Sequence, residues 1–532
     1  MAFSRIAKTL WRPKSKAFLV LTSVILALGM SSTVLAQEFN TINHLWVLIS
    51  FCLIFSMQAG FAMLESGSVP ESNVYVVAFK NLIDWTLVSI AYFIIGFGIQ
   101  FGLTSSGLFG SSFLLLNGLG YATHPVGGWT YFMFQLAFAG TAATIVSGAI
   151  AGRTGFFAYY VFSILMGELI YPVFGHWAWG NGILSQGTLL ASIGYIDFAG
   201  SSVVHMTGGV ASLVGAILIG PRLGRFGIDG KPRDPPSYPT SGALVVLGTL
   251  LLWFGWFGFN GGSTLVAGDF AGRVIFNTNL AGSAASVAAF LHAKHLQNKR
   301  YVGPKIIGGT LTGLVAITAN SHMVTPISAL LIGIFAGIIH NIAYELLLKL
   351  KIDDAVGAVP VHLFGGAFGV ISVALFGDTG IAAEFYKNVP IPLIAGGMFA
   401  QLQVQIIGVL LNLLWVGMSS FAVYFLIKKF IGLRVSPEEE IAGVTLEGGV
   451  TAKKPEFHKM TEEELRSIAG GKTVEKKPMK VTIEETANER LVAWITSYML
   501  MKDARIEECK RMLIEKGWSR EDVERAAKRG GF

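Results

Sequence analysis

Eleven apolar stretches, each long enough to cross a lipid bilayer as a helix, constrain this chain more than any other feature. A helix needs about 18 or more apolar residues to cross the hydrocarbon core. Only 14% of the residues are charged, against about 25% in soluble proteins, and the mean hydropathy is +0.59. The sequence predicts an all-α polytopic membrane protein with transmembrane helices near 41–65, 73–103, 130–151, 155–176, 198–220, 239–260, 271–293, 303–320, 325–348, 356–377 and 394–429.

The first 36 residues have the layout of a secretory signal peptide. Five basic residues precede the apolar run AFLVLTSVILALGM, and small residues follow it up to a cleavage site at Val34-Leu35-Ala36. This order predicts removal of residues 1–36 and a mature chain that starts outside the membrane. The alternative is a retained first membrane helix, which would add a twelfth span.

The basic residues support this topology independently. Lys and Arg concentrate in cytoplasmic loops, and eleven spans from an outside start place the C-terminus in the cytoplasm. The loops predicted outside contain only Lys387, with Arg273 at the start of a span. We therefore expect a multi-pass protein of the plasma (inner) membrane, with inside loops carrying Arg153, Arg222, Arg225, Lys231, Arg233, Lys294, Lys299, Arg300, Lys305, Lys349 and Lys351.

A polar tail follows the last span. Residues 431–532 hold 19 basic and 19 acidic side chains, so the net charge of +7 does not indicate a nucleic-acid partner. We expect a membrane domain over 37–443, a linker over 444–481 and a small cytoplasmic helical module over 482–532. Helices are predicted near 482–501, over Ala504–Lys516 and from Ser519. The module is similar to ubiquitin-associated docking domains; the alternative is a solvated helical appendage. It is too short to be a kinase or a cyclase.

An internal repeat lies 157 residues apart in the chain. DFAGSSVVHMTGGVASLVGAILIG (197–220) aligns with DAVGAVPVHLFGGAFGVISVALFG (354–377), which pairs Asp197 with Asp354 and His205 with His362. The copies fall in the fifth and tenth spans, so the second copy runs through the bilayer in the opposite sense. The pattern predicts a 5+5 inverted repeat plus one helix, with a substrate site near the midplane.

His205 and His362 are candidates for a facing pair inside the bundle. A titratable side chain at membrane depth is costly and indicates function, and apolar surroundings favour the neutral ring. Such a pair can pass polar molecules or relay protons. The alternative is two packing histidines bonded to backbone carbonyls. No Cys, Asp or Glu is expected at this depth, so neither a metal nor a cofactor is predicted.

Seven segments of the chain are informative as a set. They are GFAMLESG (60–67), FQLAFAGTAATIVSGAIAGR (134–153), GHWAWGNG (175–182), DFAGSSVVH (197–205), GWFGFNGGS (255–263), DDAVGAVPVH (353–362) and GLRVSPEEE (432–440). Together they resemble the ammonium transporter family (Amt/Mep/Rh), in the family's order over residues 40–443. The resemblance implies a homotrimer whose protomers each contain a pore, a transporter rather than an enzyme, and ammonium as substrate with methylammonium as analogue.

The resemblance assigns an outer recruitment site to Phe138, Trp179 and Ser263. Aromatic faces attract a cation, and a serine oxygen accepts a hydrogen bond that ammonium can donate and potassium cannot. Without the resemblance, the two aromatic residues would indicate interfacial packing.

The resemblance also implies an apolar gate, formed by Phe134 or Phe138 with Phe259, below that site. Ammonium would lose its proton there, and His205 with His362 would receive ammonia. Asp197 is expected to have a structural and electrostatic role at the start of its helix.

Two departures from the family's pattern affect regulation. Pro70-Glu71-Ser72-Asn73 replaces a basic R-x-K-N stretch, and the text after GLRVSPEEE lacks an HGE-x-AY run. The resemblance therefore does not extend to binding of PII-type signal proteins, although a cytoplasmic regulatory protein at the tail remains open. An ammonium sensor that signals through the tail is the alternative function. Trp179 and Ser263 argue against a gas channel of the Rh type.

Overall fold

The computed structural model describes residues 40–180, 187–227, 230–233, 240–297, 301–386, 391–446, 506–515 and 520–529. In these ranges every named element is helical, and only three isolated β-bridges occur. The predicted signal peptide, most of the linker and the helix expected near 482–501 lie outside the described residues.

Ten helical segments of the described chain are long and apolar enough to cross a membrane. A further apolar helix, α12 (Val302–Ile317), lies where the eighth span is expected but has only 16 residues. All eleven predicted stretches therefore contain an apolar helix. The ten longer segments are α3 (Thr41–Ser68), η1 to α5 (Glu71–Phe101), α6 (Gly128–Ala149), α7 to α8 (Phe156–Trp179), η7 with α9 (Ser201–Ile219), α10 (Gly242–Gly262), α11 (Asp269–His295), α13 (Pro326–Lys349), η8 with α14 (Val359–Phe376) and α16 (Pro392–Phe430).

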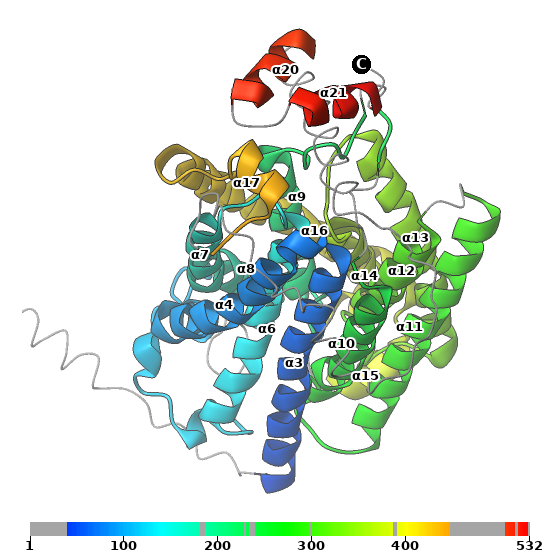
Figure 1. Cartoon of the computed structure of the whole chain (residues 1–532). Helices are drawn as coiled ribbons and strands as arrows, with labels where there is room; N and C mark the ends of the chain where they lie inside the picture. Colours follow the sequence, from blue (N-terminus) through cyan, green and yellow to red (C-terminus); the bar gives the residue numbers. More distant parts are fainter. Residues whose placement is uncertain are drawn as a thin grey trace, which may run out of the picture.

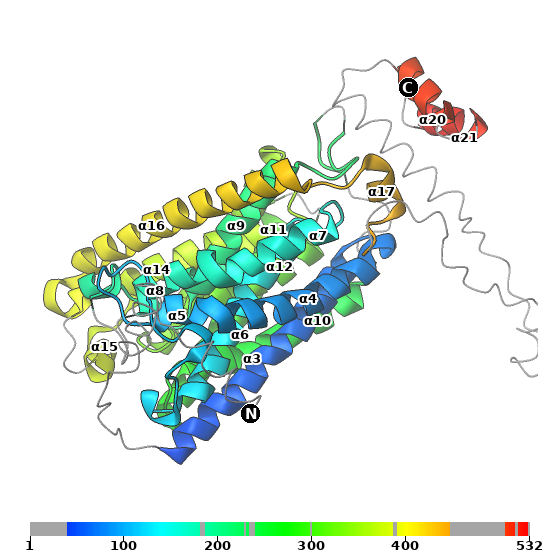
Figure 2. The ribbon, with the colours of Figure 1, turned by 90° about the vertical axis from the view of Figure 1, so that its left-hand side faces the viewer.

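The helices form a bundle around α6, which is almost entirely buried (Figure 1). α3 packs along α10, and α11 packs along α12 and α13. Figure 2 shows α16 running along one edge of the bundle, where it covers α9 and α14. α16 is broken at Gly397, where φ is +75°. The segment after the break, 398–430, would span about 50 Å at the α-helical rise, well beyond the hydrocarbon core of about 30 Å, so it must tilt or project beyond the bilayer.

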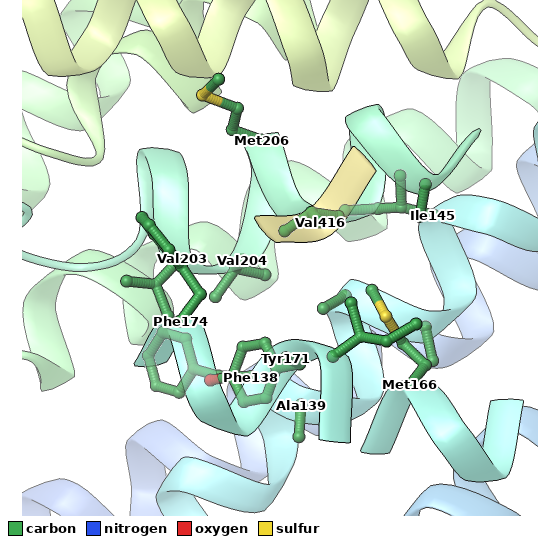
Figure 3. Close-up of a cluster of buried hydrophobic side chains, with 14 of the residues drawn as sticks. Phe138, Ala139, Ile145, Met166, Tyr171, Phe174, Val203, Val204, Met206 and Val416 are labelled. Atoms are coloured by element: carbon green, nitrogen blue, oxygen red, sulfur yellow. The ribbon is translucent and has the colours of Figure 1, made fainter. Parts of the chain in front are cut away.

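Small and aromatic side chains fill the centre of the bundle. Figure 3 shows a cluster in which α6 meets η7 (Ser201–Met206), α8 (Tyr171–Trp179) and α16. Its labelled members are Phe138, Ala139 and Ile145 of α6, Val203, Val204 and Met206 of η7, Tyr171 and Phe174 of α8, and Val416 of α16. The cluster fixes the start of η7, which carries His205.

The chain just after α16 is attached to the membrane helices. Arg434 forms an ion pair with Glu440 at 2.8 Å and donates to the carbonyl of Ile219 at 3.0 Å. The backbone N–H of Val444 donates to Oδ1 of Asn73 at 3.0 Å. Asn73 ends the stretch that departs from the family's basic pattern, so this departure contacts the beginning of the tail.

Two short helices lie in the expected tail module. α20 (Ile506–Glu515) and α21 (Arg520–Arg529) bury Leu513, Val523 and Ala527. Lys510 of α20 lies 3.1 Å from Glu524 of α21, so an ion pair joins the two helices.

Candidate functional site

The carboxylate of Asp197 fixes the turn that begins η7. Oδ1 accepts hydrogen bonds from the N–H groups of Gly200 and Ser201 at 3.0 and 2.8 Å. Oδ2 accepts from the N–H groups of Ser202 and Val203 and from the Ser202 hydroxyl, at 2.8, 2.9 and 2.6 Å. Gly200 has φ +112°, a left-handed conformation that glycine adopts without strain. Asp197 thus satisfies helix N–H groups that water cannot reach.

The second copy of the repeat contains the same turn. Asp354 accepts from the N–H groups of Gly357 and Val359, and Gly357 has φ +81°. The π-helical turn η8 (Val359–Phe364) then carries His362, as η7 carries His205. The 157-residue repeat is therefore a repeat of local structure as well as of sequence.

The two copies of the repeat cross at two glycines, each of which lies against the backbone of the other copy. A Cβ at Gly209 would collide with the backbone of His362 and Leu363, and a Cβ at Gly366 would collide with the backbone of Ser201 and Met206. Gly209 and Gly366 are equivalent in the repeat, as are Met206 and Leu363. Because each copy makes the same contact with the other, a local two-fold axis passes between them.

The two histidines lie next to each other near this crossing. Nδ1 of His205 is 3.2 Å from Nδ1 of His362, and the two rings are 19° from parallel. His205 is fully buried and His362 is 5% exposed. One ring nitrogen must donate to the other, so at least one Nδ1 carries a proton. The alternative of two packing histidines requires that the rings be hydrogen-bonded to backbone carbonyls. Among the described residues, neither ring forms such a bond.

Two aromatic residues hold the ring of His205. Trp256 stacks on it with a centroid distance of 5.0 Å, and Phe259 with 5.3 Å. Trp256 is fixed by donating its indole N–H to Oγ1 of Thr318 at 2.9 Å. The sequence analysis assigned no role to Trp256, although it lies one helical turn before Phe259 in GWFGFNGGS.

The predicted aromatic residues form one continuous group. Phe138 contacts Phe259 at 4.2 Å between centroids, Phe134 at 4.9 Å and Trp179 at 5.9 Å. Phe259 also contacts His205. Phe138 is therefore the ring partner of Phe259, whereas Phe134 is in ring contact with Phe138.

The outer residues Trp179 and Ser263 are partly exposed. The indole N–H of Trp179 donates to the carbonyl of Asp197 at 2.6 Å, so the Asp197 turn also orients this ring. The Ser263 hydroxyl donates to the carbonyl of Phe259 at 2.8 Å, which leaves its lone pairs able to accept a hydrogen bond from a cation.

A small cavity of about 20 Å³ lies on the other side of the histidines, lined by His362, Phe61 and Glu65. It adjoins a larger vestibule of about 310 Å³, whose walls include Arg222, Arg225 and Asp354. The expectation that no carboxyl group lies near the histidines is therefore wrong, because a hydropathy pattern does not show which way Glu65 points. In the described chain, no three His, Cys, Asp or Glu side chains are grouped to hold a metal.

Buried charges frame the vestibule. Asp353 forms ion pairs with Arg222 at 2.7 Å and with Arg225 at 3.3 Å. Burial alone would raise the pKa of the Asp353 carboxyl, but Arg222, Arg153 and Arg225 hold it well below its usual range. Arg153 also donates to the backbone carbonyls of Gly220 and Asp353. A single carboxylate thus joins two arginines, while the third arginine is held by backbone carbonyls.

Comparisons with known proteins agree on one family. The model of the Ammonium Transporter Family matches residues 45–447. Ammonium transporter Amt2 of Archaeoglobus fulgidus is 41% identical over 432 residues, which cover 80% of this chain and 90% of that protein. A solved structure entitled Sensor Amt Protein is 40% identical, with a TM-score of 0.71, and covers 77% of this chain and 98% of that one. The crystal structure of Candida albicans Mep2 is 26% identical, with a TM-score of 0.68, over 76% and 88% of the two chains.

Proposed function

The chain belongs to the ammonium transporter family, and from this membership we propose how its residues carry ammonium across the plasma membrane. The single observation that supports the proposal best is the continuous series of side chains from Trp179 through Phe138 and Phe259 to His205 and His362. An aromatic mouth, an apolar closure and a polar pair follow one another along one path. The matching family model and the relative from Archaeoglobus fulgidus are named as ammonium transporters, not as enzymes.

The first step is capture of ammonium at the outer mouth. Phe138 and Trp179 offer ring faces to the positive charge, and Ser263 accepts one N–H hydrogen bond. Potassium has a similar charge but donates no hydrogen bond, so the serine favours ammonium. We assign the recruitment of ammonium to these three residues.

The second step is loss of a proton before the apolar closure. Phe138 and Phe259 are buried and in ring contact, and they offer no ligand to replace the hydration shell of an ion. Passage of an intact cation would therefore cost several kcal/mol or more. Neutral ammonia loses much less hydration energy, so ammonia is the species that passes.

The third step is transfer along the histidines. Nε2 of His205 is buried and without a hydrogen-bond partner among the described residues, so it can accept from or donate to a molecule of ammonia. The Nδ1–Nδ1 bond holds both rings in place while the Nε2 atoms face the path. Asp197 takes no part in binding ammonium; it fixes the turn that carries His205 and Trp179.

Removing the ligands of the recruitment site should weaken affinity and leave folding intact. A cation–π contact or a partly buried hydrogen bond is worth about 1–2 kcal/mol. Ser263→Ala and Trp179→Leu should each raise the half-saturating ammonium concentration about tenfold. The concentration dependence of methylammonium uptake into proteoliposomes measures this.

Ser283→Ala is the matched control for the serine. Ser283 of α11 is partly exposed, as Ser263 is, and likewise donates to the carbonyl four residues earlier. Ser283→Ala should leave the dependence of transport on ammonium concentration unaltered. An identical concentration dependence in Ser263→Ala, Trp179→Leu and the control would refute the recruitment site.

We further propose that the mature protein starts near Gln37 outside the membrane, spans it eleven times and assembles as a homotrimer. N-terminal sequencing of protein extracted from membranes is expected to begin at Gln37 or a close neighbour. An intact Met1 end would contradict cleavage and would add a twelfth span.

Sensing of ammonium is the second candidate function. The observation in its favour is the likeness to the structure entitled Sensor Amt Protein, together with helices α20 and α21 beyond the membrane domain. Methylammonium uptake by the purified protein in proteoliposomes decides between the two: steady uptake supports transport, and binding without uptake supports sensing.

A further inference from the structure

Glu65 of α3 lies in the wall of the small cavity next to the histidine pair. It is only 2% exposed. The Ser147 hydroxyl and the Asn81 side-chain amide both donate to its Oε2 atom, at 2.6 and 3.1 Å. One oxygen of this carboxyl group is therefore held by two neutral donors from α6 and α4.

The other oxygen, Oε1, takes no hydrogen bond from any described residue. It lies 3.3 Å from the point that a Cβ on Gly148 would occupy, and Cγ2 of Val356 lies 2.5 Å from the same point. Val356 lines both the small cavity and the vestibule. Oε1 therefore lies at the contact between Gly148 and Val356, beside a residue that lines both spaces. A ligand in the small cavity could supply the hydrogen bond that Oε1 lacks.

The cavity has the right size and position for one small molecule. Its volume of about 20 Å³ is enough for a single molecule of the size of water or ammonia. His362 and Glu65 both line it. Five of its lining residues also line the vestibule, so it connects the histidine pair with the wider space: Leu64, Leu311, Val356, Gly357 and Val361.

The charges around Glu65 favour its uncharged form. Lys80 and Asp84 of α4 are the charged groups that act electrostatically on it, and His362 of η8 lines the same cavity. Lys80 donates to the carbonyl of Thr154 at 3.1 Å, and Asp84 accepts from the Ser163 hydroxyl at 2.9 Å. Within the described chain no basic nitrogen forms an ion pair with Glu65. If all three groups were ionised, the buried cluster would carry one excess negative charge, which protonation of Glu65 removes.

We propose that Glu65 is an inner proton-exchange site, at which ammonia leaving the histidine pair becomes ammonium again. This inference rests on the proposed function. Ammonia in the cavity accepts the proton of the Glu65 carboxylic acid: the O–H bond at Oε1 breaks, a fourth N–H bond forms, and a carboxylate–ammonium pair results. The ammonium ion leaves through the vestibule. A proton from hydronium in the cytoplasmic water returns the carboxylate to the acid.

Infrared difference spectroscopy of the reconstituted full-length protein tests the proposal directly. Perfusion with ammonium should change the carboxylic-acid C=O band in the wild type, and Glu65→Gln should abolish that change. Glu384→Gln is the matched control, because Glu384 of α15 (Thr379–Tyr386) undergoes the same substitution but is exposed, lines neither cavity and lies outside the buried cluster. The band change should persist in this control. Glu65→Asp keeps a carboxylic acid at this position, so the ammonium-induced band change should remain, at a shifted frequency.

Transport measurements give a second readout. Glu65→Gln should lower methylammonium uptake about a hundredfold, the lower limit for loss of a positioned proton-transfer group, and should remove its dependence on the internal pH. Glu65→Asp should restore part of both. The role of Glu65 would be overturned if Glu65→Gln showed wild-type uptake and the same ammonium-induced band change as the wild type. That result would leave the transport function standing. A protein whose band responds to ammonium without uptake would instead overturn the transport function while supporting Glu65 as the binding group.

Discussion

Asp197→Ala is expected to be the most destructive single substitution in the membrane domain. It removes the acceptor of five hydrogen bonds and leaves four backbone N–H groups buried without partners. Hydrogen bonds to a charged group contribute about 1.5–3 kcal/mol each, and breaking one such buried network typically costs about 3–5 kcal/mol. The variant should therefore lose most of its folded protein, and the remainder should not transport. Thermal unfolding in detergent and uptake per folded protein measure the two effects.

Asp354→Ala provides the internal control for this experiment. Asp354 occupies the equivalent position of the repeat but accepts from fewer groups, the backbone N–H groups of Gly357, Ala358 and Val359. Its loss should lower the unfolding temperature by a smaller amount. Equal unfolding temperatures for Asp197→Ala and the wild type would show that the turn does not depend on the carboxylate.

Substitution of either histidine by aspartate should change what the pore transports. His205→Asp or His362→Asp places a carboxylate in an apolar path, where it attracts an intact cation rather than a neutral molecule. Ammonium transport should be abolished, or potassium should begin to compete with it. Uptake of ammonium with and without potassium, normalised to folded protein, measures both outcomes.

His176→Asp is the control for a histidine with a packing role. The ring of His176 is fully buried and lies 2.8 Å from the carbonyl of Gln100. This variant should reduce the yield of folded protein without changing the ion selectivity of the protein that survives. The same behaviour in His205→Asp and His362→Asp would mean that the histidines pack and do not line the pore.

The sequence predicted the positions of the membrane helices because long apolar runs leave few alternatives. The repeat also predicted that His205 and His362 would meet, since equivalent residues of an inverted pair come together at its axis. These inferences depend on patterns along the chain, such as length, hydropathy and internal similarity. The structure agrees with each of them in the residues that it describes.

The role of Trp256 and the direction of Glu65 could not be predicted in the same way. Both lie in apolar helices without a clear polar face, so periodicity does not show which residues turn inward. Their places depend on contacts with distant parts of the chain: Thr318 for Trp256, and Ser147 with Asn81 for Glu65. The pairing of Phe259 with Phe138 rather than Phe134 likewise depends on how α6 is rotated against α10.

The crossing at Gly209 and Gly366 has a consequence for how the protein works over a transport cycle. Many inverted-repeat carriers open alternately to each side by rocking one repeat against the other. Here each half touches the backbone of the other through a glycine, and separating the halves would open two gaps in close-packed surroundings. We therefore expect no hinge motion between the two copies of the repeat, and a path that needs only small side-chain movements to admit the substrate. A path of this kind is expected to carry substrate in whichever direction the concentration gradient sets.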